Sequence, residues 1–157
     1  MKIFFILLWA SPLIGIAQKT DFSGNWSLNT RKTDFKQAPD WIMPVAFEIK
    51  QKKDQLVIQT KAYDKGMVQH YYTEYLPFNG SASEVMTWDD NKRNVSLHWN
   101  PIDSSITLSI RVIKSDNPSG ASYTETWSLG DDGKTLIIDR QASQADGYNI
   151  KAVYNKK

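Results

Sequence analysis

A two-residue alternation of apolar and polar side chains runs through most of this 157-residue chain and constrains its fold more than any other feature. Val45, Phe47 and Ile49 set the pattern, with more polar neighbours between them. Similar alternation recurs over residues 56–61, 94–99, 106–112, 123–129 and 135–142. Alternate side chains of a strand point to opposite faces, so each segment predicts a β-strand with one buried face.

Short turn signals separate these predicted strands. The most distinct are Asn79-Gly80, 52–54, 89–91, 116–120 and 130–134, all rich in glycine, asparagine, aspartate or lysine. No amphipathic helix of normal length interrupts the series, and no long crossover follows residue 45. We therefore expect an all-β fold, an antiparallel up-and-down β-barrel of about 8–10 strands, in which closure removes exposed strand edges.

The first predicted strand carries a glycine two residues before a tryptophan. Phe22, Gly24 and Trp26 fall on one face of the stretch 22–29. Glycine removes a side chain where another backbone or a large ring comes close. We expect Phe22, Gly24 and Trp26 to form a structural plug across one end of the barrel.

A loop over residues 30–44 follows this strand. It contains Pro39 and Pro44 and lacks alternation, which indicates a loop with room for one helical turn. Its apolar residues Phe35, Trp41 and Met43 are unusual for a freely solvated loop. Two interpretations stay open: a lid over the barrel mouth, or a plug against the barrel wall.

The first 17 residues have the pattern of a secretory signal peptide. Lys2 precedes an apolar run of about 14 residues, and Gly15 and Ala17 provide small residues for cleavage before Gln18. That run is shorter than the about 20 residues that a membrane-spanning helix needs, which disfavours the alternative of a transmembrane anchor. We expect residues 1–17 to be removed and residues 18–157 to be an exported domain without stable membrane insertion.

Composition narrows the compartment and the partners. The chain has no cysteine, so disulfides are excluded, and an exported chain of this kind indicates a bacterial periplasm or cell exterior. Its 19 basic and 17 acidic residues are scattered rather than grouped. Binding to a phosphate backbone needs clustered cations, so nucleic acid is not an expected partner.

The opening and closing stretches resemble a known group of barrels. The run from Phe22 to Asn29 resembles the G-x-W strand that opens calycins, which include lipocalins, fatty-acid-binding proteins and avidin-like barrels. The chain is most similar to small secreted bacterial lipocalin-like proteins, with matches to their late motifs at 125–129, 132–136 and 139–140. Residues 152–156 resemble the last strand of fatty-acid-binding proteins.

This resemblance implies a barrel with a central cavity for an apolar small molecule. It also implies a cation stacked over the plug tryptophan, and Arg140 is the residue that it nominates for Trp26. The middle T-D-Y-type motif of lipocalins and the helical lid of fatty-acid-binding proteins have no counterpart in this sequence.

One carboxylate and one guanidinium fall on predicted inward faces. Glu125 alternates with Tyr123 and Trp127, and Arg140 shares a face with Ile138 on the following strand. The short turn between these strands places Glu125 and Arg140 within cross-strand reach. A buried charge needs a partner, so we expect either an ion pair that fixes the strand register or a polar anchor for a ligand's carboxylate or hydroxyl group.

The candidate ligand-binding residues are inward-facing aromatic and apolar side chains together with this charged pair. They are Tyr72, Trp88, Trp99, Ile110, Tyr123, Glu125, Trp127 and Arg140. Such a set is typical of a ligand pocket. It equally suits a narrow barrel filled by its own side chains.

Residue patterns for catalysis and metal binding are missing from the sequence. His70 and His98 lie on separate predicted strands without further ligands at recognisable spacing, no G-x-S-x-G motif occurs, and paired aspartates lie in turns. We therefore expect no cofactor, no metal and no enzymatic activity. The expected function is an exported carrier of an apolar or amphipathic small molecule, and the alternative is a filled barrel acting as an envelope-associated protein-interaction module.

Overall fold

The computed structural model describes residues 19–64, 66–87, 90–114, 120–144 and 147–157. Its elements, in chain order, are β1 (Gly24–Leu28), the short 3-10 helix η1 (Asp40–Ile42), β2 (Ala46–Gln51), β3 (Gln55–Asp64), β4 (Met67–Pro77), β5 (Ser83–Met86), β6 (Lys92–Asn100), β7 (Ser105–Ile113), β8 (Ala121–Leu129), β9 (Thr135–Ala142) and β10 (Ile150–Lys156). The expected signal peptide lies outside the described residues.

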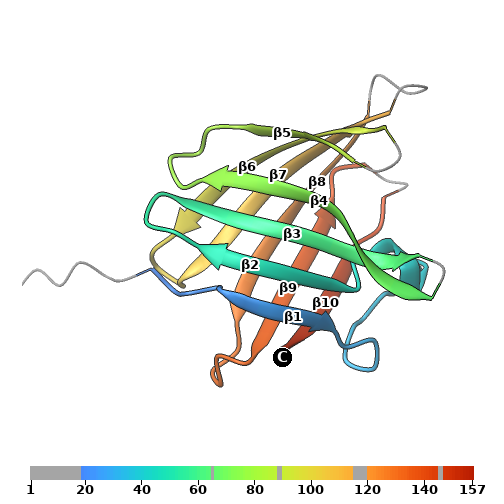
Figure 1. Cartoon of the computed structure of the whole chain (residues 1–157), viewed down its shortest axis with the longest axis horizontal. Coiled ribbons are helices and arrows are strands. Elements are labelled where there is room, and N and C mark those ends of the chain that lie inside the picture. The colour runs from blue at the N-terminus through green and yellow to red at the C-terminus, as the bar shows by residue number, and fades with distance from the viewer. Residues whose placement is uncertain (1–18, 65, 88–89, 115–119, 145–146) are drawn as a thin grey trace, which may run out of the picture.

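All described strands belong to one antiparallel sheet. Its order is β4-β3-β2-β1-β10-β9-β8-β7-β6-β5, so strands that follow one another in sequence are paired, except β4 and β5, and β1 pairs with β10. Figure 1 shows β1–β4 crossing in front of the steeper strands β6–β9, as two sides of one curved sheet. The all-β, antiparallel up-and-down barrel is confirmed, and it is nearly closed.

Closure is incomplete between β4 and β5, the two edge strands of the sheet. They lie near each other without a hydrogen-bonded ladder, and β4 also approaches β6 because β5 spans only Ser83–Met86. We call this junction the β4–β5 seam. Side chains rather than backbone hydrogen bonds therefore have to hold it.

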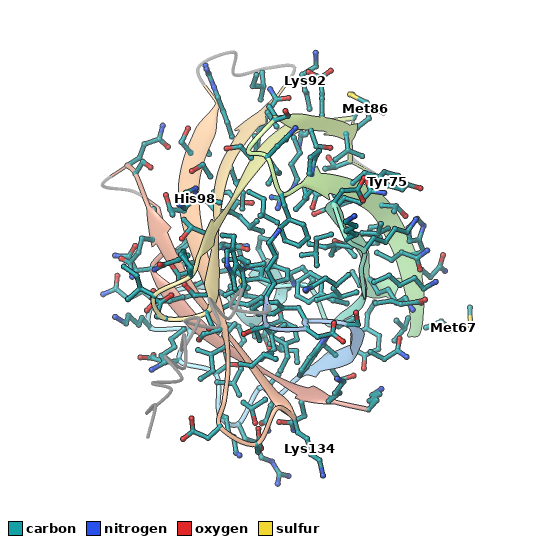
Figure 2. All side chains as sticks on the ribbon, turned by 90° about the vertical axis from the view of Figure 1, so that its left-hand side faces the viewer. Met67, Tyr75, Met86, Lys92, His98 and Lys134 are labelled. Carbon is teal, nitrogen blue, oxygen red and sulfur yellow. The ribbon has the colours of Figure 1, made fainter. Side chains whose placement is uncertain are left out.

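Side chains alternate across the wall as the sequence predicts. On β4, Glu74 and Leu76 are buried inside the barrel while Tyr75 between them is exposed. Figure 2 shows Tyr75, Met67 and Met86 pointing outward from the barrel. A register shift at Thr60/Lys61 interrupts the β3–β4 ladder.

Two of the three expected plug residues, Phe22 and Trp26, lie in the buried core, whereas Gly24 is half-buried. Phe22 and Trp26 are fully buried, and the indole Nε1–H of Trp26 donates a 2.9 Å hydrogen bond to the Phe22 carbonyl oxygen. Because its one polar group has a hydrogen-bond partner, Trp26 can be buried without leaving an unsatisfied donor, and its burial stabilises the fold.

The cation over Trp26 is Lys156, and the expectation of Arg140 is wrong. Pairing of β1 with β10 sets Lys156 opposite Trp26, and its Nζ lies 5.2 Å from the indole ring. Arg140 instead points into the lumen, where a carboxylate holds it. Gly24 makes room for the lysine, because a Cβ atom there would lie 2.5 Å from Lys156 Cε.

The loop over residues 30–44 contains one helical turn, η1, as the sequence allows. Within it Met43 is buried in the core, whereas Trp41 is 78% exposed. The tyrosine hydroxyl of Tyr154 on β10 donates to the Pro44 carbonyl oxygen over 2.9 Å and ties the loop to the barrel. No helix in the described part of the chain is long and apolar enough to cross a bilayer.

Candidate ligand-binding cavity

A cavity of about 740 Å³ occupies the end of the barrel next to the 30–44 loop. Apolar side chains from four strands and from the residue before β2 form much of its wall: Val45, Phe47, Ile58, Ala62, Val112 and Trp127. Its volume lies in the range of about 300–1,000 Å³ that is typical of small-molecule sites. The barrel is therefore not filled throughout by its own side chains.

The buried core forms the floor of the cavity. Phe47 packs against Trp127 and Tyr154, with ring centroids 5.3 and 5.0 Å apart. Phe47 and Trp127 belong both to the core cluster and to the cavity lining. The mouth differs, because its lining residues Trp41 and Tyr63 are exposed to solvent.

Glu125 and Arg140 form an ion pair inside the cavity. They are direct cross-strand partners on β8 and β9, and Arg140 Nη2 lies 2.6 Å and Nε 2.9 Å from Glu125 Oε1. The second carboxylate oxygen accepts a 2.8 Å hydrogen bond from the Trp127 indole. The predicted pair is thus confirmed, and both oxygens of Glu125 are satisfied.

A second ion pair, Glu74–Arg93, also lines the cavity. Arg93 Nε is 2.8 Å from Glu74 Oε1, and the exposed fractions of the two side chains are 9% and 3%. Glu74 belongs to β4 and Arg93 to β6, so this pair bridges the β4–β5 seam. Arg93 Nη1 also donates to the Tyr123 hydroxyl.

Tyr123 joins the two ion pairs into one polar cluster. Its ring centroid lies 4.4 Å from Arg140 Cζ and 5.8 Å from Arg93 Cζ, within cation–π range of both guanidiniums. The polar cluster, defined as Glu74, Arg93, Tyr123, Glu125 and Arg140, contains two carboxylates and two guanidiniums. Its formal charge is zero.

Burial and ion pairing act against each other on these groups. Burial favours a neutral Glu125, but the guanidiniums of Arg140 and Arg93 outweigh it and hold the pKa of Glu125 below its usual value. Burial likewise opposes the charge on Arg140, yet Glu125 and Tyr123 raise the pKa of Arg140. The Glu125–Arg140 pair is therefore charged near neutral pH.

The hydroxyl of Tyr72 also faces this cavity. Burial, partly offset by the positive charge of Arg93, raises the pKa of Tyr72 to about 12. Tyr72 therefore stays protonated and can donate a hydrogen bond under physiological conditions.

The predicted ligand-binding residues divide into three groups. Tyr72, Tyr123, Glu125, Trp127 and Arg140 all line the cavity. Trp88 lies outside the described residues.

Trp99 and Ile110 do not line this cavity. Trp99 pairs with Ile106 near the far end of the β6–β7 hairpin, three inward positions away from Arg93. Ile110 is buried in the core cluster. Inward orientation alone therefore does not place a residue at the open end of the barrel, since the other end is packed.

Sequence reasoning missed many of the lining residues, among them the charged residues Arg93 and Glu74. Extending the inward series Val95, Leu97 by one step toward the N-terminus reaches Arg93, so the alternation contained this signal. The same holds for Glu74 between Tyr72 and Leu76. The β3–β4 register shift lets the consecutive residues Tyr71 and Tyr72 both line the cavity.

Histidine and carboxylate side chains give no sign of a metal centre. Among the described residues, no group of three or more histidine, cysteine, aspartate or glutamate side chains is placed to hold an ion. His70 and His98 are both exposed, and the ring Nε2 of His70 lies 2.8 Å from the Thr73 hydroxyl.

Comparisons with models of protein families, with curated proteins and with solved structures each gave no match to this chain. What it shares with calycins is the coarse architecture, an all-β, nearly closed antiparallel barrel.

Proposed function

We propose that this protein binds one small apolar or amphipathic molecule in the cavity of its barrel. The observation that carries the proposal is the cavity itself: about 740 Å³, with apolar walls and a few polar groups at fixed positions. Binding sites for small molecules combine these two features, since apolar walls supply affinity and polar groups fix the orientation. The lowered pKa of Glu125 suits a fixed ion pair better than a proton-donating catalyst.

A titration with a neutral, environment-sensitive dye such as N-phenyl-1-naphthylamine tests this proposal. We expect saturable binding of about one dye per chain, with quenching of tryptophan fluorescence because Trp41 and Trp127 line the cavity. Native mass spectrometry of the purified protein should also reveal any molecule that co-purifies.

A blocking variant locates the dye. Ala62→Trp places an indole in the cavity from β3, and we expect it to abolish dye binding. Gln59→Trp on the same strand is the matched control, because Gln59 lies between the inward residues Ile58 and Thr60 and does not line the cavity. Equal binding by the two variants would place the dye outside the lumen.

We propose further that the chain is an exported, lipocalin-like protein of the bacterial periplasm or cell exterior. The signal-peptide pattern of residues 1–17 and the barrel architecture support this. N-terminal sequencing of the protein recovered from an exporting host should begin at Gln18. An intact Met1 terminus on the recovered protein would contradict export.

A second function is favoured by exposed apolar side chains on the outer wall. Met67, Val68 and Tyr75 on β4 and Met86 on β5 are each at least half exposed, and both strands are sheet edges. An exposed apolar patch is typical of a protein-interaction surface. If the dye fails to enter the lumen, this envelope-associated interaction module becomes the better description.

A further inference from the structure

We infer that the cavity selects amphipathic molecules with an uncharged, hydrogen-bonding head group over fatty-acid carboxylates and over cationic amphiphiles. The inference rests on the proposed ligand binding and names its ligand class. It follows from the charge balance of the polar cluster and from the donors that this cluster leaves for a ligand.

Each guanidinium in the cavity already has its own carboxylate. Arg140 is held by Glu125, and Arg93 is held by Glu74, with both glutamate side chains only 3% exposed. The remaining charged residue in the described lining is Asp40, an exposed side chain at the mouth. The described lining of the cavity therefore offers no uncompensated positive charge to an incoming anion.

A charged head group would lose its hydration in this cavity, and the described lining holds no free opposite charge that could compensate that loss. A ligand carboxylate would add a negative charge to a lumen whose guanidiniums are each already balanced by a glutamate, and an uncompensated buried charge is strongly unfavourable. A ligand cation meets the mirror-image problem, because both lumen carboxylates are bound to arginines. Both kinds of ion are disfavoured for the same reason.

A neutral oxygen can be bound without disturbing either ion pair. A guanidinium carries five N–H groups, and the hydrogen bonds among the described residues use Nε and Nη2 of Arg140 and Nε and Nη1 of Arg93. Further N–H groups on both arginines are therefore available as donors at the cavity wall. A hydroxyl or amide oxygen of the ligand accepts such bonds and adds no charge.

Three amphiphiles with one alkyl chain and different head groups test this selectivity. Dodecanol, dodecanoate and dodecyltrimethylammonium are each used to displace the neutral dye from the full protein at neutral pH. We expect dodecanol to bind at least about tenfold more tightly than either ion, a difference of about 1.4 kcal/mol. Dodecanoate binding as tightly as dodecanol would overturn the inference, whereas failure of the dye itself to bind would overturn the proposed function.

A single substitution should reverse the preference. Glu125→Gln keeps the shape of the side chain but leaves Arg140 without a carboxylate, so we expect the affinity for dodecanoate relative to dodecanol to rise at least about tenfold. Glu48→Gln is the matched control, because Glu48 forms its ion pairs with Lys50 and Lys61 on the outer face. This control should leave the ratio of affinities unchanged.

Folding of the variant is checked by circular dichroism before binding is measured. If Glu125→Gln does not fold, Glu74→Gln removes the carboxylate from Arg93 in the same way and replaces it in the test. The comparison of the three head groups on the unmodified protein needs no variant and tests the selectivity in either case. An unchanged ratio in a folded Glu125→Gln protein would show that the ion pairs do not set the ligand class.

Discussion

The side chain of Glu125 is only 3% exposed, yet it is ionised. The positive charges of Arg140 and Arg93 compensate its negative charge, and the Trp127 indole donates a hydrogen bond to it. A buried ion pair is weak evidence for stability in itself, since desolvation offsets much of the attraction. Removal of one partner is a different matter, because it leaves the other charge buried and unpaired. At the scale of single residues, the polar cluster is thus both a structural element and a determinant of ligand choice.

Glu125→Ala should destabilise the protein by about 3–5 kcal/mol, because Arg140 is left as an uncompensated buried charge. Urea unfolding of Glu125→Ala, Arg140→Ala and the double variant forms a double-mutant cycle, and we expect strong favourable coupling between the two residues. Glu84 and Lys92, an exposed ion pair, provide the control cycle, with an expected coupling of about 0–1 kcal/mol. Absence of coupling between Glu125 and Arg140 would contradict their pairing.

Tyr72 should make the protein sensitive to alkali. Burial raises its pKa to about 12, above the ordinary tyrosine value of 10.0, so its protonated form stabilises the fold below pH 10 and that contribution is lost as the pH rises toward 12. Tyr72→Phe removes this pH-dependent loss of unfolding free energy, which amounts to about 2–3 kcal/mol between pH 10 and pH 12. Unfolding free energies measured from pH 8 upward, with the exposed Tyr75→Phe as control, should show a shallower decline only for Tyr72→Phe.

At the scale of elements, β1 joins the start of the folded chain to its end. It pairs with β2 on one side and with β10 on the other, and it delivers Trp26 to the core. Lys156 from β10 covers the indole, and Gly24 from β1 leaves the space for it. One short strand therefore joins the two halves of the sheet and contributes Trp26 to the core.

Trp26→Ala should cost about 3–5 kcal/mol, the usual loss for removing a fully buried large aromatic side chain. Trp41→Ala is the control, because Trp41 is largely exposed and its removal should change the free energy of unfolding by less than about 0.5 kcal/mol. Chemical denaturation measures both. A cost below about 1 kcal/mol for Trp26→Ala would contradict its role as a plug.

At the scale of the whole molecule, the barrel is one sheet whose two edges meet at the β4–β5 seam. The Glu74–Arg93 pair spans this seam from β4 to β6 and is also part of the polar cluster in the cavity. Closure of the barrel and the charge balance of the cavity consequently depend on the same two side chains.

Arg93→Met should loosen the seam while the rest of the barrel stays folded. We expect faster amide hydrogen exchange in β4 and β5 than in the unmodified protein, with little change in β8 and β9, because local opening follows the loss of local contacts. Lys92→Met is the matched control, since Lys92 is the preceding residue on the same strand and forms a more exposed pair with Glu84. Uniform acceleration in all strands would show that Arg93 acts on global stability and not on the seam.

The sequence by itself determined the strands, the hairpins and the inward-facing residues, because alternation and turn residues act over a few positions. It also determined the Glu125–Arg140 pair, since the two residues lie on strands joined by one tight turn. Only the tertiary structure decided that Lys156 covers Trp26 and that Arg93 pairs with Glu74, because each contact joins strands that are distant in the chain or not hydrogen-bonded to each other. The cavity, too, was decided by the tertiary structure. Its volume is the space left after the inward side chains of many strands have packed, and no single segment of the sequence determines that space.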